Sequence, residues 1–289
     1  MSNINRILVL GASGMLGNAV LRFFAQISDY EVYGTARSWG SIRDLQQKAL
    51  TAKFVTGIDV DNLDSLTRLF ATVKPALVIN CVGIVKQLEE ANDPLVALPI
   101  NALLPHRLAR LAQVAGARLV HLSTDCVFSG AKGNYLESDT PDAYDLYGRS
   151  KLLGEVDYPN AITLRTSIIG HELSGARSLI DWFLSQNDTV SGYNKAVFSG
   201  FPTVEIARII RDFVMPNPHL HGLYHLSAEP INKFDLLSLV AQVYDKKISI
   251  NPNENYAIDR SLNSDRFRLA TGFNPEPWAE LIKRMHAFK

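Results

Sequence analysis

The sequence predicts an α/β fold built around a doubly wound parallel sheet, and two observations lead to that prediction. Short apolar runs alternate along the first half of the chain with stretches whose apolar residues recur at helical spacing, the pattern of parallel strands joined by crossover helices. The runs are nearly continuous in apolar side chains, as expected of strands that helices cover on both faces. We therefore expect a Rossmann-type sheet over residues 1–165 and a smaller C-terminal region over 166–289 that is partly interleaved with it.

The individual elements follow from the position of each run. RILVL at 6–10 is the first expected strand, and residues 15–27 carry apolar side chains at helical spacing directly after it. Asp61 or Asn62 is a suitable N-cap for a helix over 61–73. The other expected strands are 30–36, 52–57, 76–80, 118–124, 161–165 and 222–228, and the other expected helices are 41–50, 202–214 and 233–244. Residues 166–202 show no clear period, and 251–267 is expected to be mainly loop.

The composition excludes several classes of protein. Acidic and basic side chains number 29 each among 289 residues, so the net charge is zero, whereas a nucleic-acid-binding surface normally shows a basic excess. No apolar run approaches the roughly 20 residues of a membrane span, and the opening MSNINRILVLG lacks the pattern of a signal peptide. Two cysteines are too few for a disulfide framework, and the three histidines within 219–225 lack the further ligands of a zinc site. We expect a cytoplasmic protein that binds no nucleic acid or membrane, and no residue of the sequence is assigned to a metal.

A glycine-rich turn follows the first expected strand. GASGMLG places a Gly-x-x-Gly-x-x-Gly pattern directly after a strand and at the start of a helix. That context lets the backbone approach a pyrophosphate, which the free N–H groups of the helix N-terminus can bind. A tight turn can also use glycine for structural reasons alone, but the place of this turn at the first strand of an alternating chain favours a dinucleotide site. The predicted contacts are Gly11, Ser13, Gly14, Met15, Leu16 and Gly17.

The end of the second expected strand indicates which dinucleotide binds. An NAD site usually has an acidic residue there, which bonds the ribose 2′-hydroxyl, but this chain has TARS at 35–38. A guanidinium can pair with a 2′-phosphate instead, so Arg37 predicts a preference for NADP(H), with NAD(H) still allowed. The alternative is that Arg37 is an ordinary solvated side chain. Asp59 and Val60, after the third expected strand, are placed to border the adenine.

A tyrosine and a lysine share one face of an expected helix in YDLYGRSK at 144–151. Tyr147 and Lys151 are four residues apart and project side by side if the segment is helical. A nearby ammonium lowers the pKa of a phenol from its free value of about 10, which would let Tyr147 give a proton to a ketone oxygen. Tyr144 has Gly148 at the corresponding position and is the weaker candidate. Thr124, at the end of the preceding strand, would face the cofactor and orient the carbonyl.

Together these motifs resemble the extended short-chain dehydrogenase/reductase family. GASGMLG, VINCVG, STDCVFSG and YGRSKLLGE occur in the order of that family, and the likeness covers most of the chain. Within the family the chain is most similar to the dTDP-4-dehydrorhamnose reductases, whose Y-x-E-x-D-x-P motif corresponds to YLESDTP at 135–141. The resemblance implies that Thr124, Tyr147 and Lys151 are catalytic. It also places Asn80, Cys81, Val82, Gly83, Tyr147 and Lys151 at the cofactor.

Further residues are predicted to contact the substrate. Lys86 and Gln87 follow the fourth expected strand, where a substrate loop would lie. Arg260 or Arg266 suits the oxygens of a substrate diphosphate. Solvated surface side chains are the alternative for each of these residues. The residues of the two motifs that are predicted to contact substrate are Thr124, Asp125, Cys126 and Tyr147.

Two departures from the family pattern bear on the substrate. The family usually has Tyr after Ser-Thr-Asp, whereas this chain has Cys126, so its sugar can differ from dehydrorhamnose. Asp125 is not followed by the Glu of the related sugar-nucleotide dehydratases, which argues against dehydration.

The resemblance implies an NADPH-dependent reductase for the 4-keto group of a nucleotide-linked deoxysugar, with 166–289 as the main substrate-binding region. An epimerase or epimerase-reductase would use the same cofactor chemistry. A non-catalytic regulatory subunit, as in methionine adenosyltransferase, would bind NADP(H) without turnover. The implied partner is a nucleotide sugar, and a homodimer is compatible with each of these functions.

Overall fold

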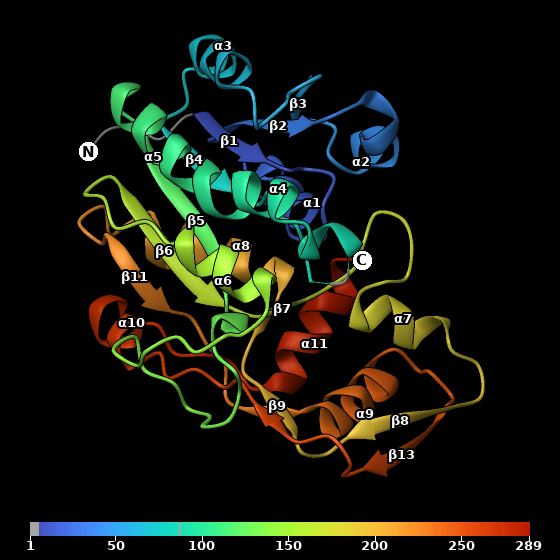
Figure 1. Cartoon of the computed structure of the whole chain (residues 1–289). Helices are drawn as coiled ribbons and strands as arrows, with labels where there is room; N and C mark the ends of the chain where they lie inside the picture. The colour runs from blue at the N-terminus through green and yellow to red at the C-terminus, as the bar shows by residue number, and fades with distance from the viewer. Residues whose placement is uncertain (1–5, 87) are drawn as a thin grey trace. The chain divides into compact units, whose positions relative to one another are not determined.

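A seven-stranded sheet organises the first part of the chain (Figure 1). The computed structural model describes residues 6–86 and 88–289; residues 1–5, which carry part of the argument against a signal peptide, and Gln87 lie outside the described residues. In sheet order the strands are β11 (Gly222–His225), β6 (Ala161–Thr166), β5 (Arg118–Thr124), β4 (Leu77–Asn80), β1 (Arg6–Leu10), β2 (Glu31–Ala36) and β3 (Lys53–Thr56). All strand pairs from β3 to β5 are parallel, and the predicted fold class is confirmed.

The direction in which strands are added reverses at β1. β2 and β3 continue the sheet on one side of β1, whereas β4, β5 and β6 continue it on the other. Ligands of open α/β sheets bind outside the carboxyl ends of the strands at such a switch point. Leu10 and Asn80, the last residues of β1 and β4, are partners in register, so the glycine turn and the β4 end leave the sheet side by side.

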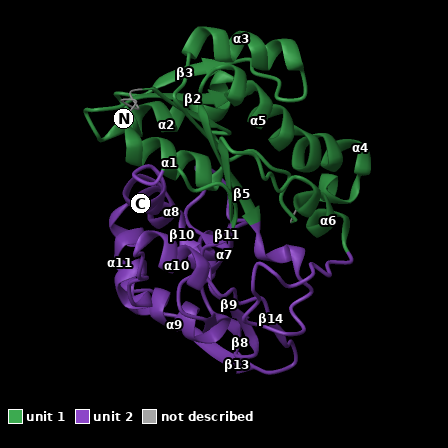
Figure 2. Ribbon diagram, turned by 90° about the vertical axis from the view of Figure 1, so that its left-hand side faces the viewer, with its two compact units in different colours: residues 1–123, 145–164, 218–223 green, residues 124–144, 165–217, 224–289 purple. Residues whose placement is uncertain are grey.

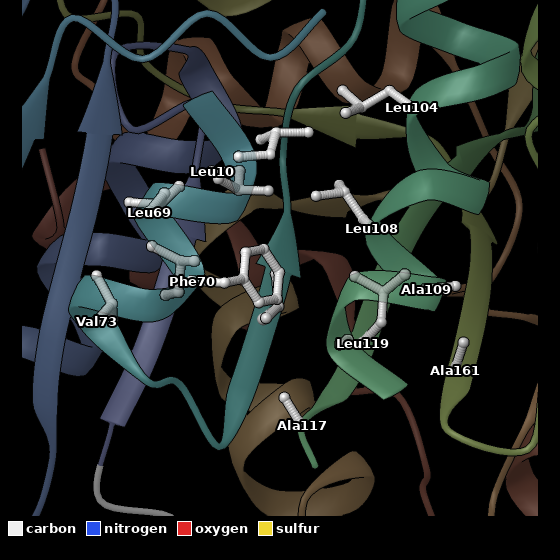
Figure 3. Close-up of a cluster of buried hydrophobic side chains, with 14 of the residues drawn as sticks. Leu10, Leu69, Phe70, Val73, Leu104, Leu108, Ala109, Ala117, Leu119 and Ala161 are labelled. Carbon is white, nitrogen blue, oxygen red and sulfur yellow. The ribbon is translucent and has the colours of Figure 1, made fainter. Parts of the chain in front are cut away.

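Helices α3 (Leu63–Val73) and α5 (Leu104–Val114) cover one face of the sheet. Figure 3 shows Phe70 of α3 and Leu108 of α5 in one cluster with Leu10 and Leu119 of the sheet. The cluster is closed to solvent, and burying each large aliphatic side chain stabilises the fold by roughly 1.5–3 kcal/mol. Asn62 is the N-cap of α3 and accepts a hydrogen bond from the Ser65 amide, so it fills the position for which the sequence offers two candidates.

Helix α1 (Met15–Ala25) covers the opposite face. Val9 in β1 pairs with Gly34 in β2, and residues opposite each other in register point to the same face of a sheet. A Cβ atom on Gly34 would lie 2.9 Å from Leu21 Cδ1 of α1, so α1 lies on the Val9 face, whereas Leu8 and Leu10 join the α3–α5 cluster. The sheet is therefore doubly wound, and α1 approaches it closely because position 34 has no side chain.

The segment between β4 and α5 contains a π turn against which another helix packs. α4 (Pro94–Ala97), the π turn η3 (Leu98–Leu103) and α5 follow one another directly. Pro105 has no N–H, so it cannot donate the hydrogen bond that the Asn101 carbonyl would accept in a regular α-helix. A Cβ atom on Gly154, just after α6 (Leu146–Leu153), would lie only 2.0 Å from that carbonyl oxygen. Glycine at 154 thus allows α6 to pack tightly on η3.

The chain forms two compact units that are interleaved in sequence (Figure 2). The first contains the described chain up to Ser123 together with Asp145–Leu164 and Pro218–Leu223. The second contains Thr124–Tyr144, Arg165–Asn217 and Tyr224–Lys289. The chain passes from one to the other within β5, β6 and β11. Thr124 therefore begins a segment of the second unit, whereas Tyr147 and Lys151 belong to the first. The first unit also contains η1 (Trp39–Ile42), α2 (Arg43–Lys48) and η2 (Glu89–Asn92).

The second unit contains more regular structure than the sequence predicts. Its elements are η4 (Asp125–Val127), β7 (Ile168–Ile169), α7 (Leu179–Ser185), β8 (Thr189–Tyr193), β9 (Ala196–Phe198), β10 (Phe201–Pro202), α8 (Thr203–Ile209), η5 (Ile210–Val214), β12 (Ile231–Asn232), α9 (Lys233–Val243), β13 (Ser249–Asn253), β14 (Ile258–Asp259), α10 (Asp265–Thr271) and α11 (Trp278–Ala287). The expected loop over 251–267 is wrong in part, because the end of β13, all of β14 and the start of α10 lie within it. Strands of two or three residues are too short to show an alternating pattern.

Other expected boundaries also shift. The helix expected over 202–214 changes at Ile210 into the π turn η5, and the strand expected over 222–228 ends at His225. None of the helices in the described chain has the length and apolar character to cross a membrane.

Candidate active site

Two glycines of the β1–α1 turn are required by the packing of the turn itself. Gly11 has a φ of 77°, in the left-handed region that favours glycine. A Cβ atom on Gly11 would lie 3.0 Å from Val82 Cγ2, and one on Gly17 would lie 2.0 Å from the Gly11 carbonyl oxygen. These contacts bring the start of α1 tightly against β1 and the β4 end.

Gly14 has no such internal requirement. It is exposed and extended, with φ −79° and ψ 164° at the N-cap of α1. A Cβ atom there would meet only the Gly11 carbonyl oxygen, at an ordinary 3.5 Å. The bare backbone therefore leaves room for a ligand rather than for protein atoms, which is the role of the second glycine in a dinucleotide turn.

The N-terminus of α1 fits an anion. No side chain caps it, and its first turn has no acidic residue. The first N–H groups of a helix have no intrahelical acceptor and attract negative charge. The turn therefore fits the pyrophosphate of a dinucleotide. The predicted contacts of the helix start are Ser13, Met15, Leu16 and Gly17.

Arg37 directly follows β2 and is exposed. Its side chain makes no hydrogen bond or ion pair with any other residue of the described chain. No acidic residue lies between the end of β2 and the start of α2. The position therefore fits a 2′-phosphate better than a bare ribose hydroxyl.

Asp59 and Val60 have local roles in the loop after β3. The Asp59 carboxylate accepts a hydrogen bond from the Asp61 amide at 3.0 Å. Val60 packs against the α3–α5 cluster. Contact of either residue with an adenine stays a prediction.

The β4 end is fixed by buried hydrogen bonds. Asn80 is buried; its Nδ2 lies 3.1 Å from His121 Nδ1, and its Oδ1 accepts from the Val82 amide at 3.1 Å. Burial raises the pKa of the Cys81 thiol to about 12, so this cysteine is unreactive near neutral pH. A Cβ atom on Gly83 would lie 3.9 Å from Lys151 Nζ. The segment that the family places at the cofactor therefore adjoins both the glycine turn and the lysine of α6.

The N-terminus of α6 is capped by an aspartate that also binds Lys86. Asp145 Oδ1 accepts from the Gly148 amide at 2.7 Å, and its Oδ2 accepts from Lys86 Nζ at 2.7 Å. Lys86, predicted to contact substrate, therefore has a protein partner, although the pair is partly exposed. Gln87 lies outside the described residues. Tyr147 follows the cap in the first turn of α6 and is half-buried, whereas Tyr144 lies before the helix and is 82% exposed.

Lys151 is buried one turn after Tyr147. Its side chain is only 6% exposed, and Nζ donates a hydrogen bond to the Leu122 carbonyl of β5 at 2.8 Å. Burial lowers the pKa of the ammonium from 10.5 to about 8, against the opposing attraction of the Glu155 carboxylate. Because the pKa stays above 7, the group keeps most of its positive charge near neutral pH and can favour a developing phenolate.

Asn101 is a positioning residue that sequence reasoning missed. Its Oδ1 accepts from the Ile84 amide at 2.9 Å, while its Nδ2 donates to the Ile84 carbonyl at 3.2 Å and to Ser150 Oγ at 3.1 Å. The side chain therefore joins the segment after β4 to α6 in the first unit. The available signal was an asparagine among apolar residues at the start of a helical stretch, INALLPHRLARLA.

Thr124, Asp125 and Cys126 form a short turn in the second unit. Thr124 Oγ1 accepts from the Cys126 amide at 3.1 Å and donates to Asp125 Oδ1 at 3.3 Å. Asp125 is 4% exposed, and burial raises the pKa of its carboxyl although Arg260 and Lys233 oppose the shift. Arg260 donates from Nε to the Phe128 carbonyl at 2.9 Å. The guanidinium is thus partly committed to the backbone just beyond this turn, and it also acts on the Asp125 carboxyl.

Arg266 and His225 contact other side chains of the protein. Arg266 lies over the Tyr224 ring, with the guanidinium carbon 4.5 Å from its centroid. His225 is buried, accepts from Arg165 Nη1 at 2.8 Å, and has a pKa lowered to about 3 by burial. No three His, Cys, Asp or Glu side chains in the described part of the chain gather into a metal-binding group.

Comparison with known proteins gives the family. The model described as the RmlD substrate binding domain matches residues 5–287. Methionine adenosyltransferase 2 subunit beta of Danio rerio is 27% identical over 259 residues, which cover 83% of this chain and 74% of the relative. A dTDP-4-dehydrorhamnose reductase of Aggregatibacter actinomycetemcomitans is 23% identical over 311 residues, which cover 98% of this chain and 99% of the relative.

Solved structures share the fold. The dTDP-4-dehydrorhamnose reductase from Bacillus anthracis, in complex with NADP, superposes with a TM-score of 0.78 at 20% identity over 99% of each chain. The UDP-Glc/GlcNAc 4-epimerase from Campylobacter jejuni gives a TM-score of 0.75 at 15% identity over 98% of each chain. At such identities the likeness shows the fold alone. Because the family model spans nearly the whole sequence, however, the chain belongs to the RmlD substrate-binding domain family, within the extended short-chain dehydrogenase/reductase superfamily.

Proposed function

We propose that this protein is an NADP(H)-dependent reductase that acts on the 4-keto group of a nucleotide-linked deoxysugar. The observation that carries the proposal is the α6 arrangement, in which a buried, charged Lys151 stands one turn from Tyr147 and beside the β4 end. Family membership and the relatives named dTDP-4-dehydrorhamnose reductase support the substrate class.

The residues of the chain have distinct roles in this proposal. When bound, NADPH supplies hydride to the carbonyl carbon. Tyr147 gives its proton to the carbonyl oxygen, and the Lys151 ammonium stabilises the phenolate that results. Lys151 is held for this task by the Leu122 carbonyl. Thr124 would orient the carbonyl; its hydroxyl proton, which now points to Asp125, would turn toward the substrate.

The cofactor fits the residues at the sheet edge. Gly14 leaves the α1 N-terminus open to a pyrophosphate, and Arg37 offers an uncommitted guanidinium to a 2′-phosphate. The remaining predicted cofactor contacts are Gly11, Ser13, Met15, Leu16, Gly17, Asp59, Val60, Cys81, Val82 and Gly83. Lys86, Asp125, Cys126 and Arg260 are the proposed sugar-nucleotide contacts. We place the enzyme in the cytoplasm, in line with Cys81 and Cys126, which form no disulfide, and a homodimer is compatible with it.

The experiment compares two tyrosines three residues apart. Wild-type protein is screened with 4-keto nucleotide sugars by NADPH absorbance, and Tyr147→Phe is then measured beside Tyr144→Phe. Loss of the general acid predicts a fall in kcat of about 10²- to 10⁴-fold for Tyr147→Phe, with an unchanged Kd for NADPH. Tyr144→Phe is the matched control and should keep nearly full turnover. Full activity of Tyr147→Phe would refute the mechanism.

A second function is favoured by the relatives named methionine adenosyltransferase 2 subunit beta, which reach 27% identity. A regulatory subunit would bind NADP(H) and consume no keto sugar. It would also copurify with, and alter the activity of, a methionine adenosyltransferase catalytic subunit. An epimerase would instead interconvert nucleotide sugars without net consumption of NADPH.

A further inference from the structure

A lysine occupies an unfavourable place in the second unit. Lys233 is the first residue of α9, directly after the N-cap Asn232, whose side chain accepts from the Asp235 amide at 2.8 Å. A helix N-terminus carries partial positive charge and disfavours a cation. Neither helix formation nor helix capping therefore explains why a lysine occupies the first position of α9.

The Lys233 ammonium has no hydrogen-bond acceptor among the residues that the structure describes. Nζ lies 3.7 Å from the centroid of the Phe198 ring. It makes no hydrogen bond or ion pair with any other residue in the described part of the chain. Burial lowers the pKa of Lys233 to about 8, although the Asp125 carboxyl and the Cys126 thiol favour the charged form. Because the ammonium is only half-buried, water can reach its N–H donors, and a ligand that displaces this water must supply an acceptor in its place.

A three-stranded sheet brings this lysine to the Thr124–Cys126 turn. β9 lies between β12 and β14, with Ile231 opposite Phe198 and Asp259 opposite Val197. Lys233 follows β12, and Arg260 follows β14. Arg260 bonds the Phe128 carbonyl just beyond the turn, and both cations act on the Asp125 carboxyl. Both basic residues therefore act on the buried acid, but of the two only Arg260 has hydrogen-bond partners within residues 6–86 and 88–289.

We propose that Lys233 is a specificity-determining residue that donates a hydrogen bond to an oxygen of the substrate's sugar, beside Asp125 and Cys126. The inference rests on the proposed function and adds a residue that the motifs do not identify. The Lys233 ammonium, at the start of α9, selects for a substrate with an acceptor oxygen at this place. Nearby, Cys126 has a small side chain at the position where the family usually has a tyrosine. A sugar that lacks this oxygen would leave the ammonium unpaired, which discriminates strongly against it.

The test separates the lysine's contact with sugar from a structural role. Lys233→Met removes the donors and keeps an apolar stem against Phe198, and Lys233→Arg keeps a cation. Lys195→Met is the matched control, because Lys195 makes an exposed ion pair with Glu254. We expect Lys233→Met to raise KM for the keto sugar by about 10- to 100-fold, the loss of one charge-assisted hydrogen bond. The changes in kcat and in the Kd for NADPH should be far smaller, Lys233→Arg should recover much of the loss, and Lys195→Met should match wild type.

Binding of the nucleoside diphosphate alone provides an independent readout. Because the proposed contact is to the sugar, the Kd of the diphosphate should be equal in wild type and Lys233→Met. If Lys233→Met does not fold, as judged by thermal unfolding, Lys233→Gln replaces it in the same comparison. An unchanged KM in a folded variant, or an equal loss of diphosphate binding, overturns the inference. Failure of wild type to consume any keto sugar would instead count against the proposed function.

Discussion

Replacing Gly14 with alanine should separate cofactor binding from folding. The backbone at Gly14 is extended, and the added Cβ would meet only the Gly11 carbonyl oxygen at 3.5 Å. Alanine is a poorer N-cap than glycine by about 0.5–1 kcal/mol, and it restricts the unfolded chain by about 0.4–1 kcal/mol in the opposite direction. The free energy of unfolding should therefore change by less than about 1 kcal/mol.

The effect on the cofactor should be much larger. A methyl group would stand where the pyrophosphate must approach the backbone, and overpacking of one methyl costs about 1–3 kcal/mol. That range corresponds to about a 5- to 150-fold increase in the Kd for NADPH. Fluorescence titration with NADPH measures the affinity, and thermal unfolding of the cofactor-free protein measures the stability.

Gly17→Ala is the matched comparison, because its Cβ would lie 2.0 Å from the Gly11 carbonyl oxygen. The backbone has to shift, so this variant should lower the free energy of unfolding by at least about 1–3 kcal/mol. Wild-type NADPH affinity in Gly14→Ala would refute the assignment of the turn to the cofactor. A Gly14→Ala protein as unstable as Gly17→Ala would refute the argument that position 14 is glycine for the ligand.

Two further predictions concern charged side chains. Arg37→Ala should raise the Kd for NADPH by about 10- to 100-fold through loss of charge-assisted hydrogen bonds, whereas the Kd for NADH, the internal control, should hardly move; equal effects on both would exclude pairing with the 2′-phosphate. Lys151 has a pKa of about 8 in the folded chain and 10.5 as its usual value, so between these values the unfolded chain binds more protons and stability rises with pH. The difference in unfolding free energy between cofactor-free wild type and Lys151→Met should accordingly rise by up to about 3 kcal/mol from pH 8 to 10.5, as measured by urea unfolding, and a flat difference would show that burial does not perturb this amine.

Local patterns were sufficient for the parallel strands of the large sheet. The apolar runs that predicted the strands became β1 to β6, and the Asn62 cap lies where the sequence allowed it. In the second unit the apolar runs are short and the strands contain two to five residues. Such short segments show too little alternation of apolar and polar residues to predict a strand. The π turns η3 and η5 were also invisible, because their sequences have the same apolar spacing as an α-helix.

The candidate site divides in the same way. Tyr147 and Lys151 could be found from their spacing, since one helical turn fixes which residues are neighbours. Asn101 and Lys233 could not be found in this way, because each interacts with residues that are far away in the sequence. Asn101 joins Ile84 to Ser150 across 17 and 49 positions.

The sequence by itself determined the alternation of strands and helices from β1 to β6, the glycine turn, the lack of an acidic residue after β2, and the tyrosine–lysine pair, because each depends on residues within a turn or two of one another. Only the tertiary structure decided which glycine is open to a ligand, which carbonyl holds Lys151, and which cation lacks a partner. Those properties depend on burial and on hydrogen-bond partners brought together by packing, and a linear pattern carries no record of either.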